Sequence, residues 1–271
     1  RVIRENRIQV VHTHGYKSDI LGLAAARVTG AYAVATPHGF ENVPDLKLQV
    51  FIRAGCLALR HFDRVAPLSE ELAADMRRIG VPVERSRMIL NGVDLSEVEQ
   101  ASLEPAPDEF PDNGERRIGY VGQMAHRKNV RDLIAAFDLL RRDHPECRLL
   151  LIGDGPQRPG LEAFARSLDA SPAIEFLGYR TDRLRLMRAM DVFCMSSTLE
   201  GIPRCMMEAM ALGRPVAAYR IPGVDRLIVH EKTGLMADLG DVSGLKSCME
   251  RILIDRTLAA VMAEEGRKHV V

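Results

Sequence analysis

Residues 192–218 read Val192-Phe-Cys-Met-Ser196-Ser-Thr-Leu-Glu200-Gly-Ile-Pro203-Arg-Cys-Met-Met-Glu208-Ala-Met-Ala-Leu-Gly213-Arg-Pro215-Val-Ala-Ala218. The apolar run at the start predicts a buried strand that ends at Met195. Pro203 predicts the start of a helix, because the fixed φ of proline suits the first helical position. Gly213 and Pro215 end that helix, and another apolar run follows. Strand, loop, helix and strand in this order predict a parallel α/β sheet.

Two carboxylates stand out in this stretch. Glu200 lies in the predicted loop, and Glu208 lies eight residues later on the helical face that can turn back toward the loop. Open α/β sheets bind ligands at the carboxyl ends of their strands, and a helix N-terminus favours phosphate. Carboxylates can accept hydrogen bonds from the vicinal hydroxyls of a ribose or hexose. Spacing alone is explained equally well by one helix cap and one surface charge.

The whole pattern Glu-Gly-Ile-Pro…Glu-Ala-Met-Ala-x-Gly-x-Pro-Val-x-Ala closely resembles the glutamate-x7-glutamate motif of the family-four retaining glycosyltransferases, which have the GT-B fold. The resemblance implies that Glu208 binds the ribose of a nucleotide-sugar donor and that Glu200 binds the hydroxyls of the transferred hexose. It also implies that the backbone of Gly201, Ile202 and Pro203 approaches the sugar and the diphosphate.

A second motif begins at Gly122-Gln123 and ends at Lys128-Asn129, between a predicted strand and a helix. The family pattern is Gly-Arg-Leu…Lys-Gly, in which the arginine and the lysine grip the diphosphate. Lys128 matches the lysine, whereas Gln123 stands where arginine is usual and Asn129 where glycine is usual. Glutamine can hydrogen-bond phosphate but brings no charge. We interpret Arg127 as a solvated surface charge; the alternative is that Arg127 compensates for the missing arginine.

Three further stretches match the family pattern, and one more histidine is assigned to the acceptor side. Gly153-Asp-Gly-Pro156 is interpreted as a tight turn that needs glycine, with direct ligand contact as the alternative. Arg180, in Leu177-Gly-Tyr-Arg180, matches the stretch whose backbone meets the nucleotide base. His38, at the C-terminal end of a predicted strand, matches a family histidine near the donor sugar and the acceptor hydroxyl; the alternative is a purely structural histidine. His14 is assigned to the acceptor side; with His12 it shares one strand face, but a third metal ligand is not evident.

Alternating strands and helices predict two Rossmann-like, doubly wound parallel-sheet domains that face a cleft. Residues 1–95 are the acceptor-side domain with four strands, the last at Arg87–Leu90. Residues 96–115, with three prolines and no periodicity, are predicted to be an irregular linker with at most a short turn or two. Residues 116–271 are the donor domain, with six strands and a short helix at Gly223–Glu231. The first strand and glycine-rich loop of the family are missing, so we expect an incomplete first domain and a chain trimmed at both ends.

Composition narrows the partners and the compartment. The 271 residues are 46% apolar and 27% charged with zero net charge, which gives no electrostatic reason to expect nucleic-acid binding. Five scattered cysteines without a C-x-x-C motif indicate reduced thiols in the cytosol. No apolar run approaches the ~20 residues of a membrane span. The amphipathic segment Leu46–Phe62 is interpreted as core-facing; the alternative is a helix that lies on the inner face of the membrane and reaches lipid-linked acceptors.

The predicted function is therefore transfer of a hexose-type sugar, with retention, from a nucleotide-diphosphate donor to a glycan or lipid-linked acceptor. UDP-sugar is the commonest donor of the family, and neither a metal nor another cofactor is expected. The alternatives are a non-catalytic nucleotide-sugar-binding module and a GT-B nucleotide-sugar epimerase. An NAD-dependent dehydrogenase is disfavoured, because no Gly-x-Gly-x-x-Gly follows a strand. The acceptor and the sugar stay open.

Overall fold

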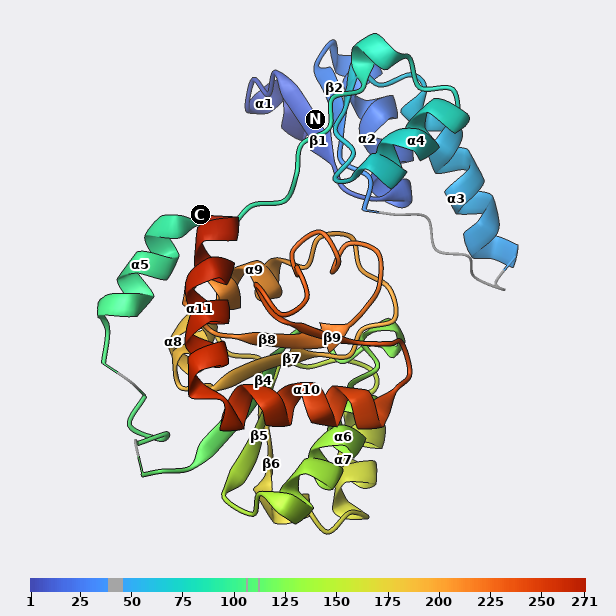
Figure 1. The fold of residues 1–271 in the computed structure, drawn as a ribbon. Helices are drawn as coiled ribbons and strands as arrows, with labels where there is room; N and C mark the ends of the chain where they lie inside the picture. Colours follow the sequence, from blue (N-terminus) through green and yellow to red (C-terminus); the bar gives the residue numbers. More distant parts are fainter. Residues whose placement is uncertain (39–45, 106, 112) are drawn as a thin grey trace. The chain divides into compact units, whose positions relative to one another are not determined.

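The computed structural model describes residues 1–38, 46–105, 107–111 and 113–271 (Figure 1). The chain divides into two compact units, unit 1 over Arg1–Asn91 and unit 2 over Gly92–Val271. Each unit is described by itself. Within the described residues, no helix has the length and apolar character that crossing a bilayer requires. All five cysteines are free thiols.

Unit 1 is built on a three-stranded parallel sheet in the order β1-β2-β3. Its elements are α1 (Val2–Glu5), β1 (Val10–Thr13), α2 (Tyr16–Thr29), β2 (Tyr32–Ala35), α3 (Leu46–Leu59), β3 (Arg64–Val65) and α4 (Glu70–Arg78). Helix α2 ends at Gly30, which adopts the left-handed conformation that glycine tolerates. The side chain of Ser69 accepts a hydrogen bond from the amide of Leu72 and thereby caps the N-terminus of α4.

The predicted fourth strand of unit 1, Arg87–Leu90, is wrong. The segment runs beside β3, where the amides of Arg87 and Ile89 donate to the carbonyls of Val65 and Pro67. A single bridge between Val65 and Ser86 is all that qualifies as pairing there. Strand β3 itself ends at Val65, and Pro67 has no amide hydrogen to donate, so the ladder cannot extend.

Unit 2 carries a six-stranded, all-parallel sheet in the order β6-β5-β4-β7-β8-β9. Helices α6, α7 and α10 cover one face, and α8, α9 and α11 cover the other (Figure 1). Its strands are β4 (Arg116–Val121), β5 (Cys147–Ile152), β6 (Ile174–Gly178), β7 (Val192–Met195), β8 (Val216–Tyr219) and β9 (Leu235–Ala237). Its helices are α5 (Leu95–Leu103), α6 (Val130–Asp143), α7 (Arg158–Arg166), α8 (Arg183–Arg188), α9 (Arg204–Ala211), α10 (Val242–Ile254) and α11 (Arg256–Val270).

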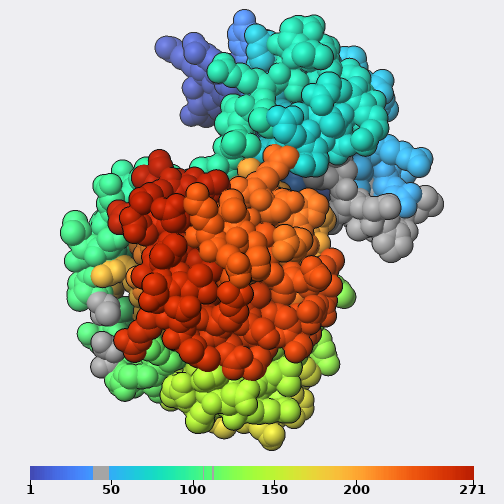
Figure 2. Space-filling model, viewed as in Figure 1, coloured from blue at the N-terminus to red at the C-terminus, as the bar shows by residue number. Residues whose placement is uncertain are grey.

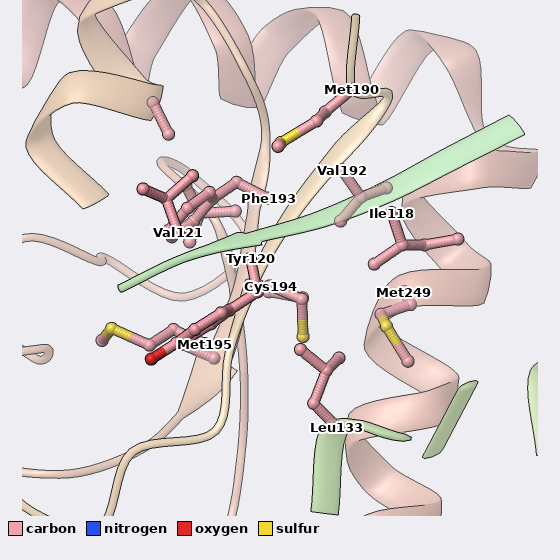
Figure 3. Close-up of a cluster of buried hydrophobic side chains, with 14 of the residues drawn as sticks. Ile118, Tyr120, Val121, Leu133, Met190, Val192, Phe193, Cys194, Met195 and Met249 are labelled. Atoms are coloured by element: carbon pink, nitrogen blue, oxygen red, sulfur yellow. The ribbon is translucent and has the colours of Figure 1, made fainter. Parts of the chain in front are cut away.

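The core of unit 2 surrounds β4 and β7, the central pair of the sheet. All four residues of β7 are buried, as a parallel strand covered on both faces requires. Figure 3 shows Ile118 and Tyr120 of β4 close to Val192 and Phe193 of β7, with Leu133 and Met249 nearby. In Figure 2 the C-terminal segments, orange to red, cover most of this side of unit 2.

The strand order of this sheet also indicates at which edge a ligand is expected to bind. From β4 the chain proceeds to β5 and β6 on one side, then crosses to β7, β8 and β9 on the other. The direction of winding therefore reverses between β4 and β7. Open α/β sheets bind ligands in the crevice outside the carboxyl ends of the strands at such a reversal. The two loops that follow β4 and β7 are the two that carried the sequence motifs.

Two other predictions fail in unit 2. The first half of the predicted linker is helix α5, which packs on α8 and α9, so the unit boundary falls at Asn91–Gly92. The Asp94 side chain caps this helix by accepting from the amides of Ser96 and Glu97, and Val98 is buried beneath it.

The predicted helix Gly223–Glu231 is a series of turns instead. Gly223 and Glu231 both have positive φ, which a helix cannot contain. In addition, the hydroxyl of Thr233 accepts a hydrogen bond from the amide of Val229. This side chain replaces the backbone carbonyl that would accept from that amide in a helix.

Candidate functional site

Lys128 and Glu200 meet at the carboxyl ends of β4 and β7. The ammonium Nζ of Lys128 lies 2.5 Å from Glu200 Oε1, although the residues are 72 positions apart. The side chains of Lys128 and Glu200 are only 11% and 6% exposed. Arg127 Nη1 lies 3.5 Å from Glu200 Oε2 and is 42% exposed. The structure thus brings together two of the residues singled out in the sequence and places the basic pair 127–128 around one carboxylate.

Hydrogen bonds between the two loops fix this pair. The amide of Thr198 donates to the carbonyl of Arg127 at 2.8 Å. The buried hydroxyl of Ser196 donates to the carbonyl of Asn129 at 2.8 Å. Because both loops are tied through main-chain atoms, the separation of Lys128 from Glu200 does not depend on their own side chains alone.

The start of the β4 loop is packed too closely for any residue larger than glycine. A Cβ on Gly122 would lie 2.7 Å from the hydroxyl of Tyr120, which donates to the carbonyl of Gln123. A Cβ on Gly153 would lie 1.9 Å from the carbonyl oxygen of Gly122. The interpretation of residues 153–156 as a turn that needs glycine therefore has a packing reason. The side chain of Gln123 is exposed.

Gly201 and Gly223 differ in what surrounds them. A Cβ on Gly223, where φ is +89°, would lie 1.5 Å from the carbonyl oxygen of Gly201. Apart from its two neighbours in the chain, a Cβ on Gly201 would meet no atom of the described residues within 4 Å. The fold therefore needs glycine at position 223 so that two backbones can approach. The space beside Gly201, in contrast, is open to solvent, which is expected where a ligand approaches the backbone.

Gly201→Ala is expected to leave the melting temperature unchanged and to weaken donor binding, because the added methyl fills space beside Glu200 without touching the protein. Gly223→Ala is the contrasting variant. We expect it to unfold several degrees earlier, since its methyl collides with backbone and its φ is unfavourable for alanine. Thermal unfolding and nucleotide-sugar titration of both variants check this pair. Equal destabilisation by the two substitutions would contradict it.

Glu208 lies on α9 and is held by arginines from two helices. Glu208 Oε1 accepts from Arg183 Nη2 at 2.8 Å and from Arg204 Nε at 3.0 Å, and the carboxylate is 4% exposed. Glu97 of α5 lies 3.5 Å from Arg183 and 3.8 Å from Arg204. Sequence reasoning missed both arginines. Arg204 could have been found from its i,i+4 spacing to Glu208, whereas no local signal connects Arg183 to α9.

Cys205 lies beside the site, in the first turn of α9. Burial raises the pKa of its thiol to about 11. The neighbouring Lys128 ammonium acts in the opposite direction, and the carboxylates of Glu200 and Glu208 raise that pKa further. Cys205 is therefore a protonated, unreactive thiol at neutral pH.

Arg180, on the loop after β6, is engaged by carboxylates. Its Nη2 lies 2.7 Å from Glu109 Oε1 and 2.7 Å from Asp182 Oδ2. These bonds raise the pKa of the guanidinium, with Asp182 the largest contributor. The structure does not bring the Arg180 side chain to Lys128 or Glu200 by any contact among the described residues. Its role beside the nucleotide base stays a prediction.

Unit 1 brings His14 and His38 together at the carboxyl ends of β1 and β2. His14 Nδ1 lies 3.1 Å from His38 Nε2, so one imidazole donates to the other. His12 Nε2 bonds the hydroxyl of Thr36 at 2.8 Å. Burial, followed by the proximity of His14, lowers the pKa of both His12 and His38. In the described part of the chain, no group of three or more His, Cys, Asp or Glu is placed to hold a metal ion.

Family comparison agrees with the two-unit division. The family described as glycosyl transferases group 1 matches residues 105–269, and glycosyltransferase family 4 matches residues 1–97. This chain belongs to the group 1 glycosyltransferases. Membership rests on most of its length, including both motif loops.

The curated relatives of this glycosyltransferase chain are named for different reactions. The lipopolysaccharide core biosynthesis glycosyltransferase LpsE of Rhizobium meliloti is 34% identical over 56% of this chain and 43% of its own length. Glycogen synthase of Mycobacterium tuberculosis is 27% identical over 98% of this chain and 65% of its own length. An Escherichia coli protein named UDP-Gal:alpha-D-GlcNAc-diphosphoundecaprenol alpha-1,3-galactosyltransferase is 26% identical over 100% of this chain and 73% of its own. The chain thus spans less than two thirds of the first two relatives.

Solved structures establish the fold. Anabaena HepE in complex with UDP has a TM-score of 0.80 at 21% identity, covering 98% of this chain and 75% of that one. Sucrose-phosphate synthase of Thermosynechococcus elongatus has a TM-score of 0.82 at 24% identity, covering 99% and 70%. The predicted α/β fold of the GT-B glycosyltransferases is confirmed.

Proposed function

We propose that this protein is a retaining glycosyltransferase that moves a hexose-type sugar from a nucleotide diphosphate, with UDP-sugar as donor, to a hydroxyl of a glycan or lipid-linked acceptor. The observation that carries the proposal is the buried Lys128–Glu200 pair at the reversal point of the unit 2 sheet. Membership in the group 1 family supports the reaction class. The names of the E. coli relative and of HepE in complex with UDP support the choice of uridine.

The two glutamates divide the donor between them in this proposal. Glu208 binds the ribose and Glu200 the hydroxyls of the hexose. Each carboxylate already pairs with cations, but a carboxylate offers about four lone-pair positions, so sugar hydroxyls can add to those contacts. The Lys128 ammonium has three donors, which lets it keep Glu200 in place while it also reaches a diphosphate oxygen. The donor is also bound by the backbone of three residues, Gly122, Ile202 and Pro203, and by the side-chain amide of Gln123.

The chemical step needs stabilisation of charge on the leaving group. The bond between the anomeric carbon and the diphosphate oxygen breaks, and the acceptor oxygen bonds that carbon on the same face. The acceptor proton passes to the leaving phosphate, so no separate base is required. Lys128 and the N-terminus of α9 stabilise the developing diphosphate charge, a contribution of several kcal/mol in a water-excluded site. We propose that the reaction needs no metal, which transfer in excess EDTA tests.

The acceptor side belongs to unit 1 in this proposal. His38 and His14 form a hydrogen-bonded pair, and imidazole nitrogens of this kind can bind an acceptor hydroxyl. We place the enzyme in the cytoplasm, with peripheral contact to the inner face of the membrane when the acceptor is lipid-linked. Exposed Phe51 and Val50 on α3 support such a contact.

Calorimetric titration with UDP, GDP and ADP, followed by the matching nucleotide sugars, tests the donor assignment. We expect UDP to bind and the other two to bind at least tenfold more weakly, because base contacts are lost. Glu200→Gln is expected to keep UDP affinity but to lose the extra affinity for UDP-hexose, since in this proposal the part of the donor that Glu200 binds is the sugar and not the nucleotide. The matched control is Glu250→Gln on α10, a carboxylate paired with Lys246 and His144. Absence of binding by every nucleotide to the folded protein would contradict the proposal.

A binding module without turnover is the second candidate, and exposed Gln123 in the place of an arginine is the observation that favours it. The two functions differ in one product. A transferase releases UDP from UDP-sugar only when an acceptor is present, whereas a binding module releases none under any condition. Coupled detection of UDP with a panel of glycan and lipid-linked acceptors separates them.

A further inference from the structure

Asn129 connects the lysine loop to helix α6 in an unusual backbone conformation. Its φ of 45° and ψ of 42° are left-handed, a region that glycine enters freely and other residues enter at a cost. The Asn129 amide Nδ2 donates to Asp132 Oδ2 at 2.7 Å. The same carboxylate oxygen accepts from the hydroxyl of Tyr219 at 3.0 Å. Tyr219 lies at the end of β8 and is 1% exposed.

We propose that Asp132 and Tyr219 are positioning residues of the donor site, which hold Asn129 in the left-handed conformation and so aim Lys128 at Glu200 and at the donor diphosphate. The inference rests on the proposed function only where it says that Lys128 is aimed at the donor diphosphate. Asp132 and Tyr219 touch neither Lys128 nor Glu200 through any contact among the described residues, so they act through Asn129.

The bonds around Asn129 explain how its backbone angle reaches the lysine. The carbonyl of Asn129 accepts from the hydroxyl of Ser196 and from the amide of Asp132. The carbonyl of Lys128 also lies 3.3 Å from the Ser196 hydroxyl. A change of φ at residue 129 would rotate the peptide that joins Lys128 to Asn129 and break these bonds. The ammonium of Lys128 would then leave the Glu200 carboxylate.

The bond from asparagine to a carboxylate is charge-assisted and therefore stronger than a neutral one. Tyr219 strengthens the arrangement from the other side. Burial, together with the hydrogen bond to Asp132, raises the pKa of the Tyr219 phenol, so it stays protonated and can donate throughout the neutral range. Asp132 is thus fixed between a buried phenol on β8 and the loop residue that it stabilises.

A substitution cycle tests the inference, because glycine at position 129 no longer needs help to be left-handed. Asp132→Ala alone is expected to lower kcat/KM for transfer by about threefold to tenfold, because Asn129 loses its charge-assisted bond and asparagine enters the left-handed region at a smaller cost than most residues other than glycine. Asn129→Gly is expected to stay near wild type. In the double variant, glycine should restore most of the activity that Asp132→Ala removes. Tyr219→Phe, which keeps the ring, should cause a smaller loss that Asn129→Gly also rescues.

A second readout needs no donor. Lys128 is buried and paired, so amine-acylating reagent should modify it slowly, as followed by peptide mass spectrometry. Asp132→Ala should accelerate that modification, and adding Asn129→Gly should slow it again. Asp138→Ala is the matched control on the same helix, since Asp138 is buried and bonds Arg142 and the amide of Ala170 instead. It should not alter Lys128 labelling.

The outcomes are distinct. Equal losses from Asp132→Ala with asparagine or glycine at position 129 would overturn the inference, as would no change in labelling or activity. If Asp132→Ala does not fold, Tyr219→Phe carries the same comparison. Rescue of Lys128 labelling in a protein that binds no nucleotide would support the positioning of the loop and refute the proposed function. Nucleotide binding without any rescue would support the proposed function and refute the positioning role of Asp132 and Tyr219.

Discussion

Lys128→Ala is expected to lower kcat for sugar transfer by about 10²–10³-fold, the usual effect of removing one preorganised donor from a developing negative charge. The structure gives the reason for so large an effect. The Lys128 ammonium is 11% exposed and held 2.5 Å from Glu200, so it is already oriented before the donor arrives. Its loss also leaves the buried Glu200 carboxylate with Arg127 as its ion-pair partner among the described residues. Steady-state kinetics at saturating donor measure the change.

A matched lysine separates this effect from a general loss of stability. Lys246 on α10 is also mostly buried, at 16% exposure, and is paired with Glu250 and Asp143. It lies among α6 and α10 residues and makes no contact with the motif loops among the described residues. Lys246→Ala is expected to lower the melting temperature as much as Lys128→Ala, with kcat within about twofold of wild type. Similar loss of kcat from both substitutions would refute the role of Lys128.

Glu208→Ala is expected to weaken UDP binding by about tenfold to a hundredfold, since a hydrogen bond to a charged group contributes ~1.5–3 kcal/mol. Binding of 2′,3′-dideoxy-UDP, which lacks both ribose hydroxyls, should be the same in the variant and in the wild type. The physical basis is the position of Glu208, whose carboxylate Arg183 and Arg204 hold nearly buried on α9. Competition titrations with the two nucleotides provide the measurement.

The dideoxy nucleotide makes this prediction specific. If Glu208 served only to hold Arg183 and Arg204 together, its removal would disturb the binding of both nucleotides alike, and the assignment to ribose would fail. Arg204→Met is a useful companion, because Glu208 keeps its bidentate contact with Arg183. We expect that variant to retain the difference between UDP and the dideoxy nucleotide.

Local signals in the sequence were sufficient for much of the fold. Strand β7 and helix α9 were predicted within a residue or two, because an apolar run, a proline and a glycine punctuate that stretch unambiguously. Helix α5 was missed, since three prolines in the surrounding residues suggested a linker, whereas the Asp94 side chain in fact caps a helix there. The turns at 221–231 were misread because backbone with positive φ at Gly223 leaves no mark in hydrophobic periodicity.

Local sequence patterns are enough to predict the parallel α/β units, the two motif loops and the candidate residues Lys128, Glu200 and Glu208. The partners of these three residues, in contrast, depend on how the strands and helices pack. Lys128 meets Glu200 because β4 pairs with β7 in the sheet, and Glu208 meets Arg183 because α8 packs on α9. Each contact joins residues that local propensity treats independently, so it arises only when the strand order brings the loops to one edge. The left-handed Asn129 also depends on Tyr219, 90 positions away in the sequence, for the support of its backbone.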